Sequence, residues 1–449
     1  MLRDGIDQYH ALLTDDIAGE TQRQLDEQLK LRGLFFGDRA LCSVLRPRFL
    51  SPAQYRFLQK RGAIVLQAFR KAHQAALAND AVLEQFRLAD WEHAFVRVPT
   101  GFRDASPVSR LDAFFVAGAG GMKFTEYNAE TPAGGGYNDV LTEVFYGLPI
   151  MREFLRHWDV QPLPARHNVL HALLDAYEQW SGLRNRPAIA IVDWADVPTQ
   201  SEFLLFQDYF VRQGIPCTIM APEEMSYEGG KLMGPGGQVS VIYKRVLLHE
   251  LVERGGIDHP ILRAFRDGAV CMVNPPACKI LHKKASLAVL SDERNAHLYG
   301  ADELEAIDLS IPWTRVVEER RTTHEQRDID LLPFIAENRE QLVLKPNDEY
   351  GGKGIVLGWE VSDAEWRDGV TLALSEPYIV QQRIPLPKEA FPSMVDGKVV
   401  FADRMVDTAP YVAYGDHIDG CLSRLATAAL LNVTAGTGTQ TPTFIAEKR

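Results

Sequence analysis

The chain has 449 residues, of which 46% are hydrophobic and 24% charged, an ordinary mix for a soluble protein of roughly two or three domains. The net charge of −12 argues against a general nucleic-acid or anionic-membrane surface. No apolar run reaches the roughly 18 residues that a bilayer span needs. The five cysteines are scattered without a CxxC pair and the first residues lack a signal-peptide core, so we expect reduced thiols and a cytoplasmic protein.

The first part of the chain favours helices. Residues 6–90 are expected to be mainly helical, most clearly over 52–78, where apolar residues recur at helical spacing among Ala, Gln, Leu, Arg and Lys. Strands are expected to begin near residues 93–98, His93-Ala94-Phe95-Val96-Arg97-Val98.

A hairpin follows. The apolar runs 108–117 and 122–128 flank Gly118-Ala119-Gly120-Gly121, and such an arrangement predicts two antiparallel strands. After Pro132 and a run of glycines, residues 138–146 predict a helix.

Residues 165–275 have an alternating strand–helix–strand rhythm that indicates a small α/β domain with a buried parallel sheet. The predicted elements are strands at 188–192, 217–220 and 239–243 and a helix at 201–213. Beyond residue 276 we expect a helix at 283–295 and strands at 341–345, 354–358 and 378–382. The last thirty residues alternate apolar runs with Gly and Thr.

Glu126 and Asn128 are the first candidates for chemistry. They lie two residues apart on a predicted strand, so both side chains leave the same face. A carboxylate and an amide oxygen on a rigid edge form the hard-oxygen pair that Mg²⁺ takes in nucleotide sites, and Asp112 on the preceding strand could supply a third oxygen. The alternative is a solvated strand face followed by a turn at Pro132.

Lys345 ends an apolar strand and is followed by a flexible loop, residues 347–354, with three glycines and Lys353. Glycines let backbone N–H groups approach phosphate oxygens, and a buried ammonium group needs an anionic partner such as a polyphosphate. The spacing is neither that of a P-loop nor GxGxxG. A plain hairpin turn is the alternative.

Two further segments could contact a nucleotide. The apolar strand that ends in Gln381 and Gln382 could offer donors and acceptors to an adenine edge, or be an ordinary edge strand. Lys279, Lys283 and Lys284 cluster at a predicted helix start, where the helix dipole disfavours cations unless an anion is bound. A solvated basic corner is the alternative.

Two arginines are placed to meet an anion. Arg110 shares a strand face with Asp112, and Arg245 ends the apolar run 241–245. Either arginine could be a structural ion-pair residue, or it could hold a carboxylate or a transferring phosphoryl group.

Together these segments resemble an ATP-grasp ligase, but the Glu-x-Asn element at 126–128 precedes the lysine loop at 345–354, whereas in the ordinary order it comes last. The chain is therefore similar to the circularly permuted ATP-grasp family, which includes glutathionylspermidine synthase. The resemblance rests on four segments: Arg110-Leu111-Asp112 with Tyr127 to Pro132; Lys279 with Lys284; Lys345-Pro346 with its glycine loop; and Gly420-Cys421-Leu422-Ser423-Arg424 with Asn432 to Gly438.

The resemblance implies a role for each matched residue. The implied metal ligands are Asp112, Glu126 and Asn128. The implied phosphate and nucleotide contacts are Lys279, Lys284, Lys345, Gly351, Gly352, Lys353 and Gly354, joined by Gln381 and Gln382, with the choice between Lys283 and Lys284 left open. The implied catalytic residues are Arg110, Arg245 and Arg424.

The resemblance also implies a fold, of class α/β (α+β): a circularly permuted ATP-grasp fold with a small pre-ATP-grasp-like α/β domain and a helical N-terminal region. The expected parts are a helical region at 1–90, the metal-binding strands at 91–165, the small α/β domain at 166–275 and the nucleotide-binding part at 276–449.

The implied function is an ATP- and Mg²⁺-dependent carboxylate–amine ligase, with two ions, that forms an amide through an acyl phosphate. The expected partners are a small carboxylate and an amine, such as an amino acid, peptide or polyamine. Ala133 stands where the synthase has a hydroxyl residue, so the substrates are expected to differ. The alternatives are a small-molecule kinase on the same scaffold, a nucleotide-binding protein without ligase activity, and an unrelated α/β protein.

Overall fold

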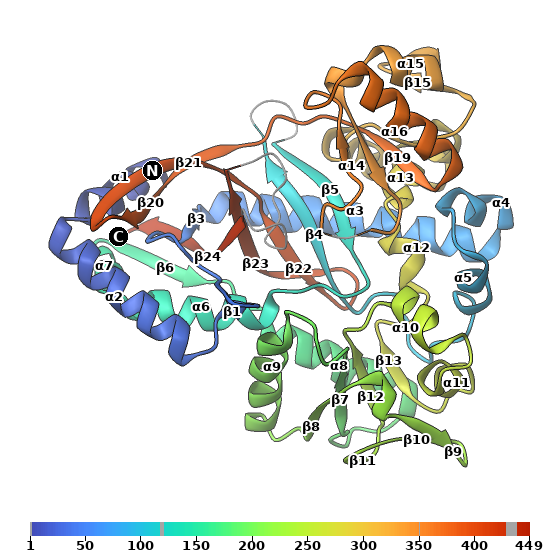
Figure 1. The fold of residues 1–449 in the computed structure, drawn as a ribbon, viewed down its shortest axis with the longest axis horizontal. Helices are drawn as coiled ribbons and strands as arrows, with labels where there is room; N and C mark the ends of the chain where they lie inside the picture. The colour runs from blue at the N-terminus through green and yellow to red at the C-terminus, as the bar shows by residue number, and fades with distance from the viewer. Residues whose placement is uncertain (1, 117–120, 350, 428–437) are drawn as a thin grey trace.

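The computed structural model describes residues 2–116, 121–349, 351–427 and 438–449. Helices surround three larger sheets, so the predicted mixed α/β class is confirmed (Figure 1). Some predicted segments lie outside the described residues, namely Ala117 to Gly120 of the hairpin turn, Tyr350 of the glycine loop, and Asn432 to Thr437.

The N-terminal part is mainly helical, as predicted. Its helices are α1 (Leu2–Leu12), α2 (Asp15–Leu31), α3 (Pro52–Ala78) and α4 (Asp80–Leu83), followed by η1 (Glu84–Phe86). Helix α3 starts at residue 52 because Ser51 and Gln54 form a reciprocal capping box. A small hairpin, β1 (Phe35–Phe36) with β2 (Arg39–Ala40), interrupts the helices.

The predicted strand at residues 93–98 is wrong, because helix α5 (Asp90–Phe95) occupies this segment. The Glu92 carboxylate accepts a hydrogen bond of 2.7 Å from the Ala89 backbone N–H and so caps the helix start. Phe95 and Val96, which fall in the predicted strand, are buried neighbours at the helix end.

The central sheet joins strands from both ends of the chain. Strands β4 (Val108–Phe115) and β5 (Met122–Asn128) form the predicted antiparallel hairpin, and β4 also pairs with β22 (Ala409–Ala413). The other strands of this sheet are β3 (Arg48–Leu50), β6 (Trp158–Pro162), β20 (Lys388–Val395), β21 (Lys398–Val406), β23 (His417–Ala426) and β24 (Gly438–Lys448).

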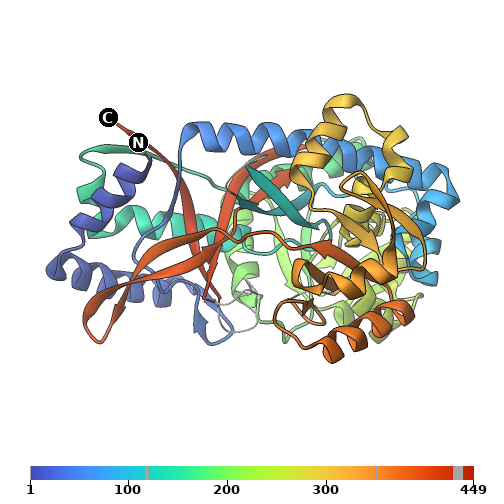
Figure 2. The same ribbon diagram turned by 90° about the horizontal axis from the view of Figure 1, so that it is seen from above.

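Helix α3 packs across the central sheet, which Figure 2 shows from above. The approach is close at Gly62, where an added Cβ would lie 2.2 Å from the Cδ1 atom of Ile418 on β23. Helix α1 and strand β24 lie at the same end of the molecule and contact each other (Figure 2).

A four-stranded parallel sheet confirms the predicted strand–helix–strand rhythm. Its order is β13 (Cys271–Val273), β12 (Val241–Lys244), β7 (Ile189–Val192), β8 (Cys217–Met220). Helices α8 (Arg166–Ser181), α9 (Gln200–Arg212), α10 (Leu248–Gly255) and α11 (Pro260–Arg266) accompany it, and β9 (Ser226–Glu228), β10 (Lys231–Gly234) and β11 (Gly237–Gln238) form a small antiparallel sheet beside it.

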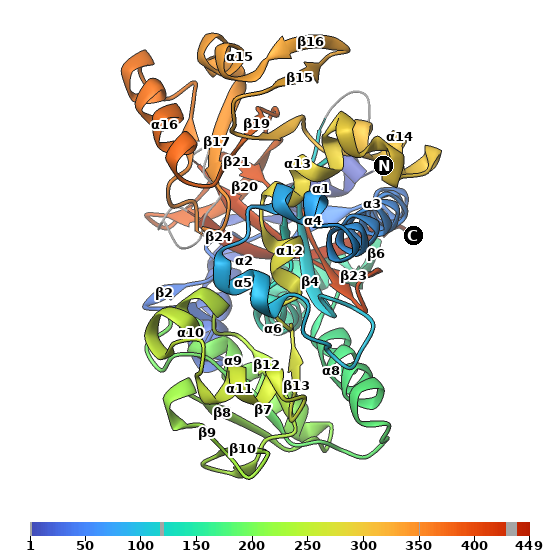
Figure 3. The same cartoon turned by 90° about the vertical axis from the view of Figure 1, so that its right-hand side faces the viewer.

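A four-stranded antiparallel sheet lies at the opposite end of the molecule from the parallel sheet (Figure 3). Its order is β14 (Thr314–Val316), β19 (Tyr378–Gln382), β17 (Leu342–Pro346), β18 (Val356–Leu357), and it includes the three strands predicted after residue 340. The remaining elements are α6 (Gly135–Gly147), α7 (Pro149–Phe154), η2 (Pro222–Glu224), η3 (Glu293–Leu298), α14 (Ala301–Ser310), β15 (Arg321–His324), β16 (Arg327–Asp330), α15 (Leu331–Glu337), η4 (Arg339–Gln341) and α16 (Asp363–Ser375).

The helix predicted over 283–295 forms only in part, as α13 (Ala285–Ser291). Lys283, with a non-helical ψ of 132°, makes a break between α13 and the preceding α12 (Cys278–His282), and the extended Asp292, with a ψ of 127°, ends α13 before η3. Asn347 anchors the break, since its side-chain oxygen accepts from the Ala285 N–H at 2.8 Å and its backbone oxygen accepts from the Lys284 N–H at 3.0 Å. Among the described helices, none is both long and apolar enough to cross a membrane.

Candidate active site

A cavity of about 1130 Å³ is lined by strands of the central and antiparallel sheets and by residues that follow two strands of the parallel sheet. Its walls include side chains of β4, β5 and β23 from the central sheet, β17 and β19 from the antiparallel sheet, and the segments that follow β7 and β12. Residues far apart in the sequence therefore face one common space.

The hairpin β4–β5 brings the predicted metal ligands together at the cavity wall. Asp112 lies directly opposite Glu126 in the register, and Arg110 lies opposite Asn128, so all four side chains share one face. The amide nitrogen of Asn128 donates to Asp112 Oδ2 at 2.9 Å. All four residues line the cavity.

Two arginines neutralise Asp112. Arg110 binds it through two bonds, Nε to Oδ1 at 2.7 Å and Nη2 to Oδ2 at 3.1 Å, and Nη2 of Arg424 donates to Oδ2 at 2.7 Å. Burial alone would raise the pKa of Asp112, but the two guanidinium groups hold it at about 2. The carboxylate is therefore ionised at neutral pH.

Glu126 is the more exposed acid of the pair. Its carboxylate lies 3.3 Å from the Nζ atom of Lys284. Burial works to raise the pKa of Glu126, but Lys284, Lys345 and Arg424 lower it overall. Glu126 is thus a second ionised oxygen donor beside Asp112.

Lys345 reaches the same region from strand β17. Its Nζ donates to Gln381 Oε1 at 2.7 Å and lies 3.4 Å from the backbone oxygen of Thr125. Burial lowers the pKa of Lys345 to about 8, and no carboxylate of the described residues lies within ion-pair distance of it. A buried ammonium group in this state favours an anionic ligand.

The lysines predicted at the helix start divide into two groups. Lys284 does not line the cavity among the described residues, but it pairs with Glu126, which does, and it donates to the backbone oxygen of Glu349 at 2.6 Å. Lys279 and Lys283 instead point to the interior. The geometry thus favours Lys284 over Lys283 as a ligand contact. The predicted contact between Lys279 and the nucleotide stays a prediction, and the ion pairs of Lys279 do not favour it.

Lys279 and Lys283 belong to what we call the interior ion cluster, whose other members are Glu92, Glu130, Lys244 and Asp348. Lys279 Nζ lies 3.0 Å from Glu130 and 2.6 Å from Asp348. Lys283 bridges Glu92 and Asp348, and Lys244 pairs with Glu130 at 3.2 Å. These close opposite charges lower the pKa of Glu130 against the effect of burial.

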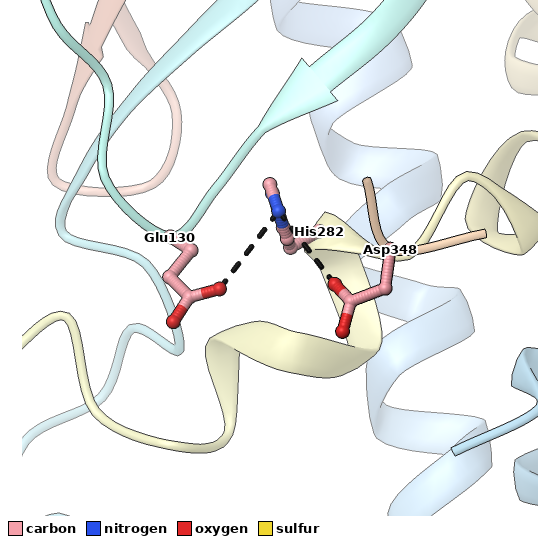
Figure 4. Close-up of side chains that lie close together, drawn as sticks. All are labelled: Glu130, His282 and Asp348. Atoms are coloured by element: carbon pink, nitrogen blue, oxygen red, sulfur yellow. Dashed lines mark ion pairs between the residues drawn. The ribbon is translucent and has the colours of Figure 1, made fainter. Parts of the chain in front are cut away.

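His282 lies between two acids of this cluster, as Figure 4 shows, 3.8 Å from both Glu130 and Asp348. These three residues form the one group of His, Cys, Asp and Glu side chains in the described chain whose ligand atoms lie within 4.8 Å of one another. Lys279 donates to both carboxylates, so an ammonium group already bridges them. We therefore assign no metal to this group.

The glycine loop after Lys345 borders the cavity at Gly351 and Gly352, whose φ angles of 69° and 79° favour glycine. Lys353 is exposed and pairs with Glu349 at 3.2 Å. In the described residues, neither Lys353 nor Gly354 lines the cavity, so their phosphate contacts stay predictions.

The far end of the cavity coincides with a topological switch point. Strands β7 and β12 are neighbours, but β7 continues through α9 to β8 on one side and β12 continues to β13 on the other. Ligands of open α/β sheets bind at the carboxyl ends of strands at such a point. Asp193 follows β7 and Arg245 follows β12, and both line the cavity.

The Arg245 side chain is buried, and among the described residues only part of its guanidinium group has a hydrogen-bond or ion-pair partner. Its Nη1 donates to the Pro132 backbone oxygen at 2.5 Å, and its Nη2 lies 3.8 Å from Glu202. Its Nε has no hydrogen-bond partner within the described part of the chain. Burial raises the pKa of Asp193 to about 6, against the pull of Arg245. Glu250, another lining acid, accepts from the indole N–H of Trp194 at 3.0 Å.

Sequence reasoning missed three residues that shape the site. Asp193 directly follows the buried strand β7, and that position at a parallel strand's carboxyl end could have revealed it. Asp407, which pairs with Arg424, and Phe36, which lines the cavity from the N-terminal hairpin, belong to no motif. Their roles follow only from tertiary contacts.

No family model matches the chain, and no curated protein matches it by sequence. Among solved structures it is similar to a glutathione synthetase-like effector from Globodera pallida, with 12% identity, a TM-score of 0.60 and coverage of 96% of this chain and 98% of that one. The two chains share a fold.

Two other solved structures are less similar to this chain. A putative gamma-glutamylcysteine synthetase from Methylobacillus flagellatus has 12% identity and a TM-score of 0.43, over 88% of this chain and 89% of that one. D-alanyl-alanine synthetase A from Vibrio cholerae has 10% identity and a TM-score of 0.24, over 49% and 67%.

Proposed function

We propose that this protein is an ATP- and Mg²⁺-dependent carboxylate–amine ligase with a circularly permuted ATP-grasp fold. One observation carries the proposal. The acids of β4–β5 and the lysine of β17 come from opposite parts of the chain and face the same cavity, with Lys284 3.3 Å from Glu126 and Lys345 3.4 Å from the Thr125 oxygen. The shared fold with a glutathione synthetase-like effector supports it.

The permuted order draws support from strand pairing. Strands β4 and β5 precede the lysine strand β17 by more than two hundred residues in the sequence, yet β4 pairs with β22, which follows β17. We keep the four-part layout of 1–90, 91–165, 166–275 and 276–449 as part of this proposal. The three sheets, each with its own core, are consistent with it.

The antiparallel sheet would hold the nucleotide. Lys284, Lys345 and the N–H groups at Gly351 and Gly352 would bind the phosphates, since charged donors bind phosphate oxygens strongly. The adenine would lie against the apolar part of the cavity beside Gln381 and Gln382. That part is lined by Val343, Ile355, Leu357, Trp359 and Ile384.

Asp112, Glu126 and Asn128 would hold Mg²⁺, and their chemistry fits the ion. The three side chains offer hard oxygen atoms on adjacent strands, both carboxylates are ionised, and all face the cavity. When bound, Mg²⁺ would neutralise the charge on the phosphate oxygens during transfer.

The switch-point end would take the acceptor substrates. Arg110 and Arg245 would orient a carboxylate, because a guanidinium group binds it through two parallel bonds. Asp193 and Glu250 line the same end without an ion-pair partner among the described residues, so they would receive an ammonium group.

The reaction then has a clear order. A carboxylate is a poor acyl donor because its leaving group would be oxide. Its oxygen attacks the γ-phosphorus of ATP, the bond to the ADP oxygen breaks, and an acyl phosphate forms. The amine attacks the acyl carbon, loses a proton, and displaces phosphate to give the amide. Enclosure by the glycine loop would exclude water, which would otherwise hydrolyse the acyl phosphate.

ADP release in the presence of ATP, Mg²⁺ and a panel of amino acids, peptides and polyamines tests the proposal. We expect an amide product by mass spectrometry, and a fall of at least about a thousandfold for Glu126→Ala because the transferring charge loses its metal. Asp403→Ala, an exposed acid on β21, is the matched control and should retain activity.

Each contrary result has its own meaning. A phosphoester product would identify a kinase instead. Tight binding of Mg·ATP without turnover on any substrate would identify a nucleotide-binding protein. Amide formation that survives Glu126→Ala would overturn the metal-ligand assignment.

A further inference from the structure

Asp407 is a fully buried acid, and both oxygens of its carboxylate accept hydrogen bonds from the same residue, Arg424. It lies between β21 and β22, where Thr408 exchanges two backbone hydrogen bonds with Ala113 of β4. Its Oδ1 accepts from the backbone N–H of Arg424 at 2.5 Å, and its Oδ2 accepts from Nε of the same residue at 2.5 Å. Asp407 is thus fixed next to Asp112 in the sheet but binds Arg424 instead.

Arg424 spans two acids. While Asp407 holds its Nε side, the opposite end of the guanidinium group, Nη2, donates to Asp112 Oδ2 at 2.7 Å. Arg424 lines the cavity, whereas Asp407 is not among the described residues that do so. Any effect of Asp407 on a ligand must therefore pass through Arg424.

The Oδ2 atom of Asp112 carries more donors than it can keep when a cation binds. It accepts from Arg110, Asn128 and Arg424 together. A carboxylate oxygen has about two lone-pair sites, so a metal at Oδ2 must displace at least one donor. Arg110 stays bound to the same carboxylate through Nε and Oδ1, whereas Arg424 can leave Asp112 altogether because its bonds to Asp407 remain.

We propose, on the basis of the proposed function, that Asp407 is a positioning residue for Arg424. When the metal binds Asp112, Asp407 keeps hold of Nε, and the Nη end of Arg424 moves from Asp112 to a phosphate of the nucleotide. The same arginine thus occupies the cation position before the metal binds and meets the nucleotide afterwards. Without the charge of Asp407, Arg424 would keep Asp112 as its sole acid and would compete with the metal.

The binding of ADP, with and without Mg²⁺, tests this assignment by calorimetry on the full chain. For Asp407→Asn we expect the ADP affinity at saturating Mg²⁺ to fall about tenfold, as for the loss of one charged hydrogen bond. In EDTA, without the metal, Arg424 should keep its hydrogen bond to Asp112 in both proteins. The ADP affinities of the variant and the wild type should then agree within about twofold. Asp403→Asn, on the preceding strand β21, is the control.

A double-mutant cycle separates positioning from a general structural role. Arg424→Gln should weaken binding at least as much as Asp407→Asn, and the double variant should bind no more weakly than Arg424→Gln alone. Arg424→Lys should behave like Arg424→Gln, because an ammonium group cannot bind both acids at once. This variant also keeps the test decisive if Asp407→Asn fails to fold.

The outcomes are distinct. Additive losses in the double variant, an equal loss in EDTA, or full binding by Arg424→Lys would overturn the role of Asp407 while leaving the ligase proposal intact. Failure of the wild-type protein to bind ADP in either condition would instead overturn the proposed function, and this assignment with it.

Discussion

Two charged clusters share the short segment that holds Glu126 and Glu130, but they differ in how completely their charges are paired. Glu126 belongs to the cavity cluster, with Asp112, Asn128, Arg424, Lys284 and Lys345, whereas Glu130 belongs to the interior ion cluster. The Glu130–Lys244 pair is 0% exposed on both sides, while the side chain of Glu126 is 28% exposed. In the interior each acid meets lysines at close range, but in the cavity Lys345 has no acid within ion-pair distance among the described residues.

The pairing of charges therefore distinguishes structural from ligand-binding residues in this fold. Complete pairing away from solvent indicates a structural role, since a buried charge is tolerated only with a partner. Incomplete pairing at a cavity wall indicates a ligand that supplies the missing charge. Three experiments test this distinction, and a fourth tests the part of the cavity proposed to bind substrate.

The largest effect is expected for Glu130→Gln. The amide would leave Lys244 and Lys279 buried without their shared acid, so the free energy of unfolding should fall by about 3–5 kcal/mol. Urea denaturation measures it. Glu126→Gln, the matched isosteric change four residues earlier, should cost under about 1 kcal/mol while abolishing activity. Equal stability losses would erase the contrast between the clusters.

Lys284→Met and Lys283→Met should separate two neighbours in the sequence. The first should weaken Mg·ADP binding about ten- to hundredfold, as for a lost charged hydrogen bond, with little change in the unfolding midpoint. The second should lower the midpoint and leave the ADP affinity of the folded fraction nearly intact, because Lys283 pairs with Glu92 and Asp348. Calorimetry beside thermal unfolding measures both, and the reverse pattern would contradict the assignment.

The pH dependence of nucleotide binding should report Lys345. Burial lowers the pKa of this lysine to about 8, so the ammonium group that would bind phosphate is present below pH 8 and is lost above it. ADP affinity should therefore fall about tenfold per pH unit above 8. Lys345→Arg, which stays charged, should flatten this limb. A wild-type affinity that is level from pH 7 to 9 would contradict the expected titration of Lys345 in this range.

The smallest effect is expected at Phe36. The β1–β2 hairpin is fixed where Tyr137 and Ser201 donate to the Phe35 oxygen at 3.0 and 2.8 Å, and Phe36 lines the cavity. Phe36→Ala should change the relative kcat/KM of small and large substrates by a few-fold, with ADP affinity unchanged. Leu31→Ala, a change at an exposed residue nearby, is the control. A substrate profile of Phe36→Ala identical to that of the wild type would show that Phe36 does not contact the substrate.

The sequence predicted those parts whose signal is local. The hairpin β4–β5 follows from two apolar runs around a glycine turn, and the lysine strand and its loop follow from a strand that ends in Lys345-Pro346. The small α/β domain follows from the strand–helix–strand rhythm. These signals need only the periodicity of neighbouring residues.

The parts that could not be predicted depend on distant partners. Lys279, Lys283 and Lys284 are alike in the sequence, and only the break between α12 and α13 turns the first two toward the acids of the interior. Residues 93–98 look like a strand until the cap at Glu92 is known. Asp407 acts on the site through Arg424, whose bond to Asp112 joins residues 312 positions apart. Phe36 is placed by the hydrogen bonds of Tyr137 and Ser201 to its neighbour Phe35, over 102 and 166 positions, and no local pattern records such contacts.

Strand β24 has a consequence for the biosynthesis of this protein. It pairs with β3 in parallel and with β6 and β23 in antiparallel orientation, while β22 completes the edge of β4. On the ribosome, β3, β4 and β6 emerge hundreds of residues before the partners that cover them. Non-local pairing of this kind slows folding and leaves open strand edges in the nascent chain. The nucleotide cavity is therefore expected to assemble only after residues 409–448 have been translated, and chaperone demand should be concentrated in that interval.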